Sequence, residues 1–346
     1  MCPTSLIAVH ADFDATWPFA ADHWRSRWQA QGPTSFIRVG RGDRRVLSEL
    51  LDEGAGVTRL AALGVPVTAA CVDALPDLRE AAILSAYRPA TLPEVTERLA
   101  ARGVELYQQR SEGFWSQSVA EFALALTICA LRGIPQQYQA MQSDHEVWQR
   151  YRPERNTGPG QVGAQFSDDL RFTNGTVAGK RVRIVGAGNI GSRYASFCHA
   201  LGADVAAWDP LAPDPGFHRA GARRVWRLEE LVCDAEIFAP MLPLTEQTRG
   251  LVTAAHLRAL PKGCLVVLVT RAGIVEMGEL RRRVLADELA LAADVFDVEP
   301  LPLDDPLLGR ANVVHTPHLA GRTRDANLAW VEMLLAQFRS TASHDG

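Results

Sequence analysis

The chain has 346 residues, of which 47% are apolar, and a formal net charge of −4 at pH 7. This length suits two domains, and the apolar fraction is that of a folded globular protein rather than a disordered chain. Because basic residues are scattered and form no cluster, we expect no nucleic-acid partner. No uninterrupted apolar run reaches the length of a membrane span, so we also expect no membrane partner.

The cysteine spacing and the N-terminal sequence predict the cellular compartment of the protein. Six cysteines are spread along the chain and form no CxxC pair. That spacing predicts reduced thiols in a reducing environment. The first residues contain no basic stretch leading into an apolar run, so the sequence shows no signal peptide. We therefore expect a cytoplasmic protein.

The first third of the chain alternates short apolar segments with segments of helical spacing. This alternation predicts a parallel sheet covered by helices. The predicted strands are Ser5–His10, Ser35–Val39, Thr58–Leu63, Ala82–Ser85 and Val104–Tyr107, and the predicted helices are Arg44–Glu53 and Pro93–Arg102.

The rest of the chain predicts a second unit of the same kind. An almost entirely apolar helix, Gln117–Met141, is expected to be buried between layers or domains. Tyr151–Thr176 is rich in Gly, Pro and polar residues and predicts a long loop. A new series of apolar strands then begins at Lys180, as in a parallel sheet buried on both faces. Its strands are predicted at Arg181–Val185, Asp204–Trp208, Glu236–Pro240, Leu265–Val269, Leu291–Phe296 and Asn312–Thr316, before a final amphipathic helix at Asp325–Phe338.

The second series opens with the sequence VRIVGAGNIG, which contains a GxGxxG motif between an apolar strand and a helix. In that position the motif is typical of dinucleotide binding. Gly186 permits the tight turn, Gly188 lets the backbone approach a pyrophosphate, and Gly191 lets helix and strand pack closely. The free N–H groups at the helix N-terminus then bind the anion. A glycine-rich turn without a ligand is the alternative interpretation.

The next predicted strand ends in an acidic residue, Asp209, eighteen residues after Gly191. A carboxylate there accepts hydrogen bonds from the adenosine ribose and repels a 2′-phosphate, so we expect NAD rather than NADP. The residues directly after this acid include no arginine, although Arg219, Arg223 and Arg224 are near enough in the chain to fold back.

Arg271, Glu299 and His318 follow three late strands of this series. Ligands of open α/β sheets bind beyond the carboxyl ends of the strands. An arginine there binds a carboxylate through a forked pair of hydrogen bonds and polarises the adjacent carbonyl. A histidine delivers a proton as a hydride arrives, and a nearby carboxylate stabilises the imidazolium. The three residue types together predict reduction of a 2-oxo acid.

Each of these residues also has a structural interpretation. A lone arginine after a strand is usually a surface charge, and a glutamate before Pro300 is compatible with a simple turn. His315 and His318 are compatible with a structural pair at a strand end whose ring nitrogens are hydrogen-bonded, or with a zinc-binding HxxH motif. No third ligand is apparent and Pro317 breaks the helix that would present the pair, so we expect no metal.

These motifs resemble those of the D-isomer-specific 2-hydroxyacid dehydrogenase family, which includes D-3-phosphoglycerate dehydrogenase. They occur in the family's order, and the later ones are far more specific than GxGxxG. The matching segments are VAEFALAL at 119–126, IVGAGNIG at 184–191, MLPLTEQTRGLV at 241–252, VTRAGIVEMGEL at 269–280, ADVFDVEPLP at 293–302 and TPHLAG at 316–321.

The resemblance implies a role for each site residue. Arg271 binds substrate, Glu299 assists, and His318 is the acid and base. NAD is the implied cofactor. The cofactor contacts implied by the motif and the resemblance together are Gly186, Gly188, Asn189, Ile190, Gly191, Asp209, Pro243, Thr248, Val269, Thr270, Arg271, Asp294, His318 and Ala320.

The resemblance also implies an α/β fold of two similar doubly wound domains. Residues 1–116 and 317–346 would form a flavodoxin-like substrate domain, and residues 117–316 a Rossmann NAD domain. Family members commonly pair through the NAD domain, which implies a homodimer.

The chain departs from the family pattern in two places. The segment Tyr151–Thr176 looks longer than usual, and a Gly-rich substrate loop similar to GxGxD is replaced by LSAYRPA. We expect Tyr87 and Arg88 of this loop to contact the substrate. Arg88 would be a second positive group beside Arg271, suited to a substrate with two anionic ends, and Tyr87 would contact the ring of an aryl acid. The alternative is that Arg88 points outward toward a surface acid such as Glu94.

We therefore expect an NAD-dependent oxidoreductase that interconverts a small anionic 2-oxo acid and its D-2-hydroxy acid, in the reductive direction. Formate dehydrogenase shares the fold but has Gln at the position of Glu299. Phosphite dehydrogenase keeps the Arg, Glu and His set and stays an alternative. A non-catalytic dinucleotide-sensing interaction protein, like the corepressors derived from this family, also keeps the motifs, but no basic run or long disordered tail supports it here.

Overall fold

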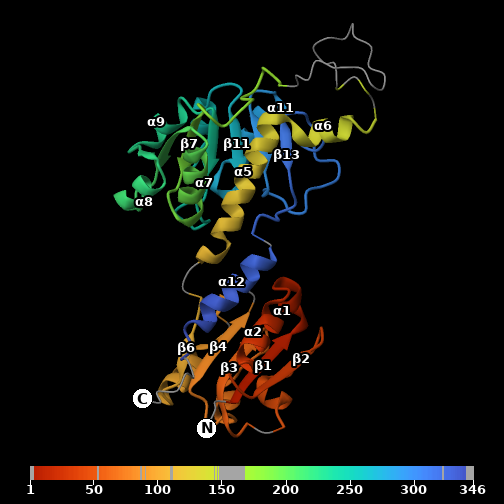
Figure 1. Cartoon of the computed structure of the whole chain (residues 1–346), viewed down its shortest axis with the longest axis vertical. Helices are drawn as coiled ribbons and strands as arrows, with labels where there is room; N and C mark the ends of the chain where they lie inside the picture. Colours follow the sequence, from red (N-terminus) through yellow and green to blue (C-terminus); the bar gives the residue numbers. More distant parts are fainter. Residues whose placement is uncertain are drawn as a thin grey trace. The chain divides into compact units, whose positions relative to one another are not determined.

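The computed structural model describes residues 4–52, 54–85, 88–89, 91–109, 112–143, 145, 147, 168–321 and 323–339. The chain divides into two compact units, shown in Figure 1. Unit 1 comprises Met1–Trp115 and Arg322–Gly346, and unit 2 comprises Ser116–Gly321. Unit 2 is thus inserted into unit 1 along the sequence.

Unit 1 is built on a parallel sheet. Its strand order is β2-β1-β3-β4, with β6 pairing in parallel with β4 and the two-residue β5 pairing antiparallel with β4. This is the order of flavodoxin-like doubly wound folds, and it confirms the predicted fold class for this unit. The strands are β1 (Thr4–His10), β2 (Thr34–Val39), β3 (Val57–Leu63), β4 (Glu80–Ser85), β5 (Arg88–Pro89) and β6 (Glu105–Tyr107).

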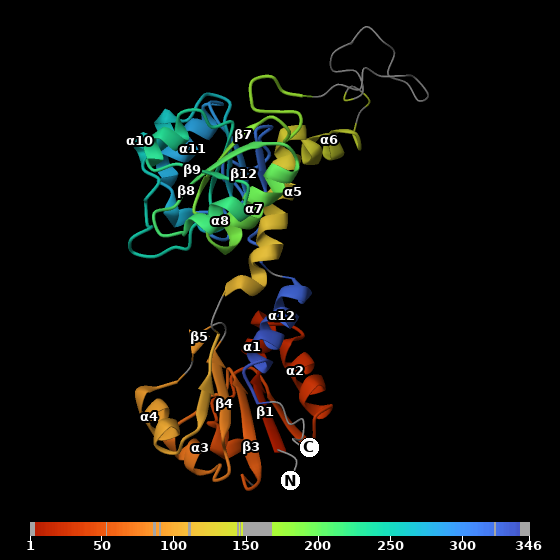
Figure 2. The ribbon, with the colours of Figure 1, turned by 60° about the vertical axis from the view of Figure 1, so that its left-hand side comes forward.

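Helices cover both faces of this sheet, as Figure 2 shows. Helices α3 and α4 pack on one face. Helices α1, α2 and α12 pack on the other, where aromatic rings fill the core and Trp330 of α12 stacks on Trp17 with ring centres 4.6 Å apart. The helices are α1 (Ala11–Thr16), α2 (Ala20–Gln29), α3 (Ala69–Asp73), α4 (Pro93–Ala101) and α12 (Arg324–Leu335), with single 3₁₀ turns η1 (Leu47–Leu50) and η2 (Glu112–Trp115).

The predicted helix Arg44–Glu53 is wrong, because this segment contains only the single turn η1. Two acidic side chains satisfy backbone N–H groups locally. Asp43 accepts from the N–H of Arg45 at 3.0 Å, and Glu49 accepts from the N–H of Val46 at 2.8 Å. Such local side-chain bonds compete with the helical hydrogen-bond pattern.

Unit 2 contains a sheet of seven parallel strands in the order β13-β12-β11-β10-β7-β8-β9. The chain order reverses between β7 and β10, which makes their carboxyl ends the switch point of a Rossmann fold, as predicted. The strands are β7 (Arg181–Val185), β8 (Asp204–Trp208), β9 (Arg223–Arg224), β10 (Ile237–Pro240), β11 (Leu265–Leu268), β12 (Ala290–Ala293) and β13 (Val313–His315).

Two apolar layers lie on the two faces of this sheet. Helices α5, α7 and α8 contribute to one layer and α9, α10 and α11 to the other. The helices are α5 (Ser116–Arg132), α6 (Ile134–Ala140), α7 (Asn189–Ala200), α8 (Asp214–Arg219), α9 (Leu228–Val232), α10 (Ala254–Ala259) and α11 (Met277–Leu285), with a 3₁₀ turn η4 (Ala272–Ile274).

The long helix predicted at Gln117–Met141 is two helices, α5 and α6. Gly133 between them has a φ of 58°, in the left-handed region that glycine tolerates best. Pro135, in the first turn of α6, has no N–H with which to continue the hydrogen-bond ladder of α5. Gly133 and Pro135 therefore explain the break. The sequence-based prediction gave more weight to the continuous apolar pattern than to these two residues.

Helix α5 is long and apolar. By length and hydropathy alone, Gly113–Arg132 would be able to cross a bilayer, which differs from the expectation that no segment could. A core helix passes the same test, and 39% of the 18-residue apolar window within this stretch is buried. Val119, Ala120, Ala123 and Leu126 pack in the core beside the sheet. This packing accounts for the apolar residues on one face of α5.

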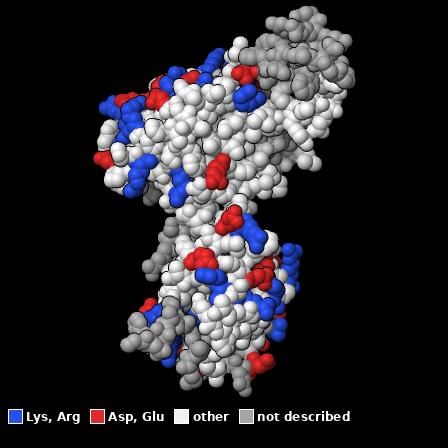
Figure 3. Space-filling model, viewed as in Figure 1, with Lys and Arg blue, Asp and Glu red and all other residues white. Residues whose placement is uncertain are grey.

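The described surface is mixed in charge. On the face shown in Figure 3, acidic and basic side chains are interspersed on each unit and neither sign forms a broad patch. Five cysteines that the structure describes are free thiols: Cys71, Cys129, Cys198, Cys233 and Cys264. Of the predicted loop Tyr151–Thr176, residues 151–167 lie outside the described residues.

Candidate active site

The GxGxxG turn lies between β7 and α7, at the switch point of the sheet. Gly186 has a φ of 100°, and a Cβ there would lie 2.7 Å from Leu242 Cδ2. A Cβ on Gly191 would collide with the carbonyl oxygen of Gly186. A Cβ on Gly188, by contrast, would meet no atom within 4 Å. The turn therefore needs two of its glycines for its own geometry, and the third faces space that suits a pyrophosphate beside the N-terminus of α7.

Asp209 directly follows β8, and its side chain is hydrogen-bonded to the glycine turn. Its Oδ2 accepts from the N–H of Ala187 at 2.8 Å, and its Oδ1 accepts from the N–H groups of Leu211 and Ala212 at 2.9 and 3.0 Å. A carboxylate has about four lone-pair positions, so room remains for a hydroxyl donor. The arrangement fits the predicted contact with an adenosine ribose.

The other predicted cofactor contacts lie at the carboxyl ends of the same sheet. After β10, Thr248 Oγ1 donates to the carbonyl oxygen of Pro243 at 2.6 Å and closes a compact loop. After β11, Val269 and Thr270 are buried, and Thr270 Oγ1 donates to the carbonyl oxygen of Pro240 at 3.2 Å. In α7, Asn189 is exposed and Ile190 packs against the core.

His318 and Glu299 contact each other beyond the ends of β13 and β12. His318 Nδ1 lies 2.7 Å from Glu299 Oε2, and Glu299 Oε1 accepts from the N–H of Phe296 at 2.8 Å. The His318 side chain is 43% exposed, so its other ring nitrogen is accessible to a ligand. The structure thus brings together the two residues that the sequence predicted as a pair.

The backbone of His318 takes an unusual conformation, with a φ of 56°. Asp294, which is fully buried, accepts from Thr316 Oγ1 at 2.6 Å and from the N–H groups of Leu319 and Ala320 at 2.9 and 2.8 Å. These bonds hold the residues on both sides of His318 and stabilise its left-handed turn. Asp294 was predicted only as a cofactor contact. Its support of the turn was missed, and no local sequence signal reveals it.

Arg271 begins the turn η4 after β11 and is exposed. Its Nη1 donates to the carbonyl oxygen of Thr270 at 2.7 Å. Among the described residues, the guanidinium of Arg271 makes one hydrogen bond, to this carbonyl oxygen, so most of the fork is open to a ligand. Because β11, β12 and β13 are neighbours, Arg271, Glu299 and His318 all lie at one end of the sheet.

The loop that carries Glu299 is anchored to α11. Arg281 Nη2 lies 2.5 Å from Asp305 Oδ2 and Arg281 Nη1 lies 3.4 Å from Asp297 Oδ1. Asp305 is nearly buried, and the neighbouring Leu307 lies in the core. This anchor was not predicted either, because the ion-paired residues are distant in sequence and no motif connects them.

The proposed substrate loop of unit 1 is described only in part. Tyr87 and the side chain of Arg88 lie outside the described residues, and only the backbone of Arg88 is placed, in β5. Their contact with substrate, and the alternative ion pair with Glu94, stay predictions.

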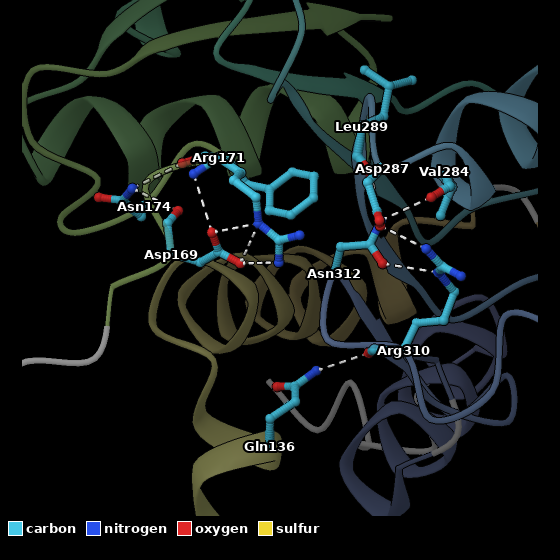
Figure 4. Close-up of polar contacts among 10 residues, drawn as sticks. Gln136, Asp169, Arg171, Asn174, Val284, Asp287, Leu289, Arg310 and Asn312 are labelled. Atoms are coloured by element: carbon cyan, nitrogen blue, oxygen red, sulfur yellow. Dashed lines mark hydrogen bonds and ion pairs between the residues drawn. The ribbon is translucent and has the colours of Figure 1, made fainter. Parts of the chain in front are cut away.

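A cavity of about 100 Å³ lies at the opposite, amino-terminal edge of the sheet of unit 2. Gln136 and Asn312 are among its lining residues, and Figure 4 shows both. Asn312 Nδ2 donates to the carbonyl oxygens of Val284 and Leu289 at 2.9 Å, and its Oδ1 accepts from Arg310 Nε at 3.1 Å. These contacts hold the starts of the strands together, and the cavity is remote from the sheet end that carries Glu299 and His318.

A seven-stranded parallel sheet with a glycine-rich turn at its switch point and an acid after the next strand defines a dinucleotide-binding domain. The model for the NAD-binding domain of D-isomer specific 2-hydroxyacid dehydrogenases matches residues 124–320. The chain belongs to this family. The predicted resemblance and the predicted NAD cofactor are thereby confirmed.

Curated relatives include dehydrogenases and reductases. D-3-phosphoglycerate dehydrogenase of Archaeoglobus fulgidus is 31% identical over 64% of this chain and 38% of its own length. Glyoxylate reductase of Aeropyrum pernix is 30% identical over 66% of this chain and 64% of its own length. The matched region thus spans less than two thirds of either relative.

Solved structures show the same fold. A phosphoglycerate oxidoreductase from Rhizobium etli has a TM-score of 0.68 at 20% identity, with 96% of this chain and 93% of that chain covered. D-mandelate dehydrogenase of Rhodotorula graminis has a TM-score of 0.65 at 19% identity, with 97% and 93% covered. These similarities confirm the two-domain α/β fold class.

Proposed function

We propose that this protein is an NAD-dependent dehydrogenase that interconverts a small 2-oxo acid and its D-2-hydroxy acid, acting as a reductase. The observation that carries this proposal is the 2.7 Å contact between His318 and Glu299, on strand ends next to the one that bears Arg271. Membership of the dehydrogenase family supports the same reaction.

Each residue of this set has a distinct task. NADH, when bound at the glycine turn, supplies the hydride. Arg271 binds the substrate carboxylate through two parallel hydrogen bonds and polarises the neighbouring carbonyl. His318 donates a proton from Nε2 to the carbonyl oxygen as negative charge develops there. Glu299 accepts from Nδ1, which fixes the ring and stabilises the imidazolium before transfer.

We assign the two units complementary tasks. Unit 2 binds NAD, and unit 1 contributes to the binding of a small anionic substrate. We place the protein in the cytoplasm as a homodimer that pairs through unit 2. The exposed apolar residues of α6 and its C-terminal cap, Ile134, Tyr138 and Met141, support pairing because such a patch favours a protein interface.

One screen tests the reaction. NADH oxidation is followed at 340 nm with a panel of 2-oxo acids that includes phosphorylated and phosphono compounds, and NAD⁺ reduction is followed with phosphite. We expect turnover of at least one 2-oxo acid and its loss in His318→Ala. Turnover of phosphite alone would replace this proposal with phosphite oxidation. Tight NADH binding without any turnover would replace it with a sensing role.

A further inference from the structure

Arg224, at the end of the edge strand β9, lies against the segment that carries Asp209. Its Nη2 donates to the carbonyl oxygen of Asp209 at 3.3 Å. Its guanidinium carbon lies 3.9 Å from the ring centre of Trp226 and 4.9 Å from that of Phe217. An arginine stacked on aromatic faces keeps its plane fixed and its N–H donors at the rim. The cation is therefore oriented toward the loop after β8.

Asp214, the first residue of α8, neutralises this cation. Its Oδ1 lies 2.5 Å from Arg224 Nη1. The Asp214 side chain is 82% exposed, and ion pairs with an exposed partner add little to stability. The pair instead sets the local charge: Asp209, Asp214 and Arg224 together carry two negative charges and one positive.

We infer that Arg224 is a phosphate-binding arginine masked by Asp214, and that Asp214 and Asp209 together determine the preference for NAD over NADP. The inference rests on the dinucleotide site of the proposed function and not on its reaction. A 2′-phosphate at the ribose would be repelled by Asp209. The planar fork of Arg224 is suited to that phosphate, but its Nη1 is already paired with Asp214.

The carboxylates of Asp209 and Asp214 make separable contributions to the charge around Arg224. Replacing Asp209 alone leaves Arg224 paired with Asp214, so the local charge is neutral. Replacing both leaves an unpaired guanidinium between Trp226 and Phe217, and the local charge becomes positive. Arg224 is then available to a 2′-phosphate without any movement of the sheet.

Isothermal titration calorimetry with NAD⁺ and NADP⁺ tests this inference on the full chain. The variants are Asp209→Ser, Asp214→Asn and the double substitution, with thermal unfolding to verify folding. We expect the double variant to bind NADP⁺ at least about tenfold more tightly than Asp209→Ser, as one charge-assisted hydrogen bond provides. Adding Arg224→Gln to the double variant should abolish that gain.

The matched control combines Asp209→Ser with Glu230→Gln, which removes an exposed carboxylate from α9 in the same unit. Its NADP⁺ affinity should equal that of Asp209→Ser alone. Equal NADP⁺ affinity of the single and double variants, or a gain that survives Arg224→Gln, would overturn the inference. If the wild type binds neither nucleotide, the dinucleotide site itself is refuted. If binding follows expectation but no acid is turned over, only the proposed reaction fails.

Discussion

Nδ1 of His318 and Oε2 of Glu299 lie 2.7 Å apart although the residues follow different strands and are 19 positions apart in the chain. The contact has a chemical consequence. A ring that donates from Nδ1 to a carboxylate presents Nε2 as the nitrogen that exchanges a proton with substrate. In the proposed reaction, the two nitrogens of this imidazole therefore have different tasks.

Replacing His318 should remove the proton donor without removing the cofactor site. We expect His318→Ala to lower kcat by roughly 10²–10⁴-fold, the range for general acid catalysis, with NADH affinity nearly unchanged. Steady-state kinetics and NADH fluorescence titration measure the two quantities. His315→Ala, three residues earlier on β13, is the matched control and should retain activity. A loss of equal size in the control would point to a structural effect.

Glu299→Gln should alter the pH dependence of reduction. Gln keeps an oxygen that can accept from the N–H of Phe296, but it lacks the negative charge that stabilises the imidazolium. We therefore expect the fall in kcat/KM with rising pH to occur at lower pH than in the wild type. The measurement is kcat/KM from pH 5 to 9. An unchanged profile would mean that the pair does not act as a unit.

Arg271→Lys should impair the proposed turnover although it keeps the charge. Lysine lacks the planar fork, so one of two charge-assisted hydrogen bonds to the substrate carboxylate is lost. Such a loss costs about 1.5–3 kcal/mol, or roughly 10- to 150-fold in kcat/KM. Arg227→Lys, on the surface before α9, is the control and should show no change. A near-normal kcat/KM in Arg271→Lys would show that Arg271 has a structural role and does not bind the substrate carboxylate.

Asp294→Asn should destabilise the turn that carries His318. The buried carboxylate accepts three hydrogen bonds, and an amide would place an N–H₂ group against one of the donors. Leaving one buried donor unsatisfied costs about 1–3 kcal/mol. Thermal unfolding should show a lower Tm, with a fall in kcat. The exposed Asp304→Asn is the control, and equal Tm shifts in the two variants would contradict this account.

Tyr107 should make unit 1 sensitive to alkali. Burial, together with its hydrogen bond to Glu80, raises the pKa of Tyr107 to about 12. The unfolded phenol loses its proton near pH 10, so stability from this group is present below pH 10 and is lost as pH rises to about 12. Urea unfolding between pH 8 and 12 should show a shallower decline in Tyr107→Phe than in the wild type. Tyr138→Phe, at an exposed residue, should decline as the wild type does.

Apart from the two-residue strands β5 and β9, the positions of the strands and of the strand-end residues could be predicted from the sequence, because apolar runs and the glycine turn carry that information locally. The side-chain contacts between segments that are distant in the sequence could not be predicted. The anchor between Arg281 and Asp305, and the stacking of Arg224 on Trp226, depend on side chains that meet only after the sheet has formed. The break at Gly133 was missed for another reason: a strong apolar pattern outweighed one glycine and one proline.

The interrupted course of unit 1 bears on the order in which the chain folds during synthesis. Trp330, Leu334 and Phe338 of the α12 segment are buried against Trp24 and Trp28. The part of unit 1 that precedes unit 2 in the sequence is therefore synthesised with this aromatic surface uncovered, and the surface stays uncovered while unit 2 is being made. Unit 2 is continuous in sequence and can close first. The core of unit 1 is thus completed only when α12 has been synthesised. A nascent chain stalled before α12 would expose tryptophans to chaperones and to aggregation.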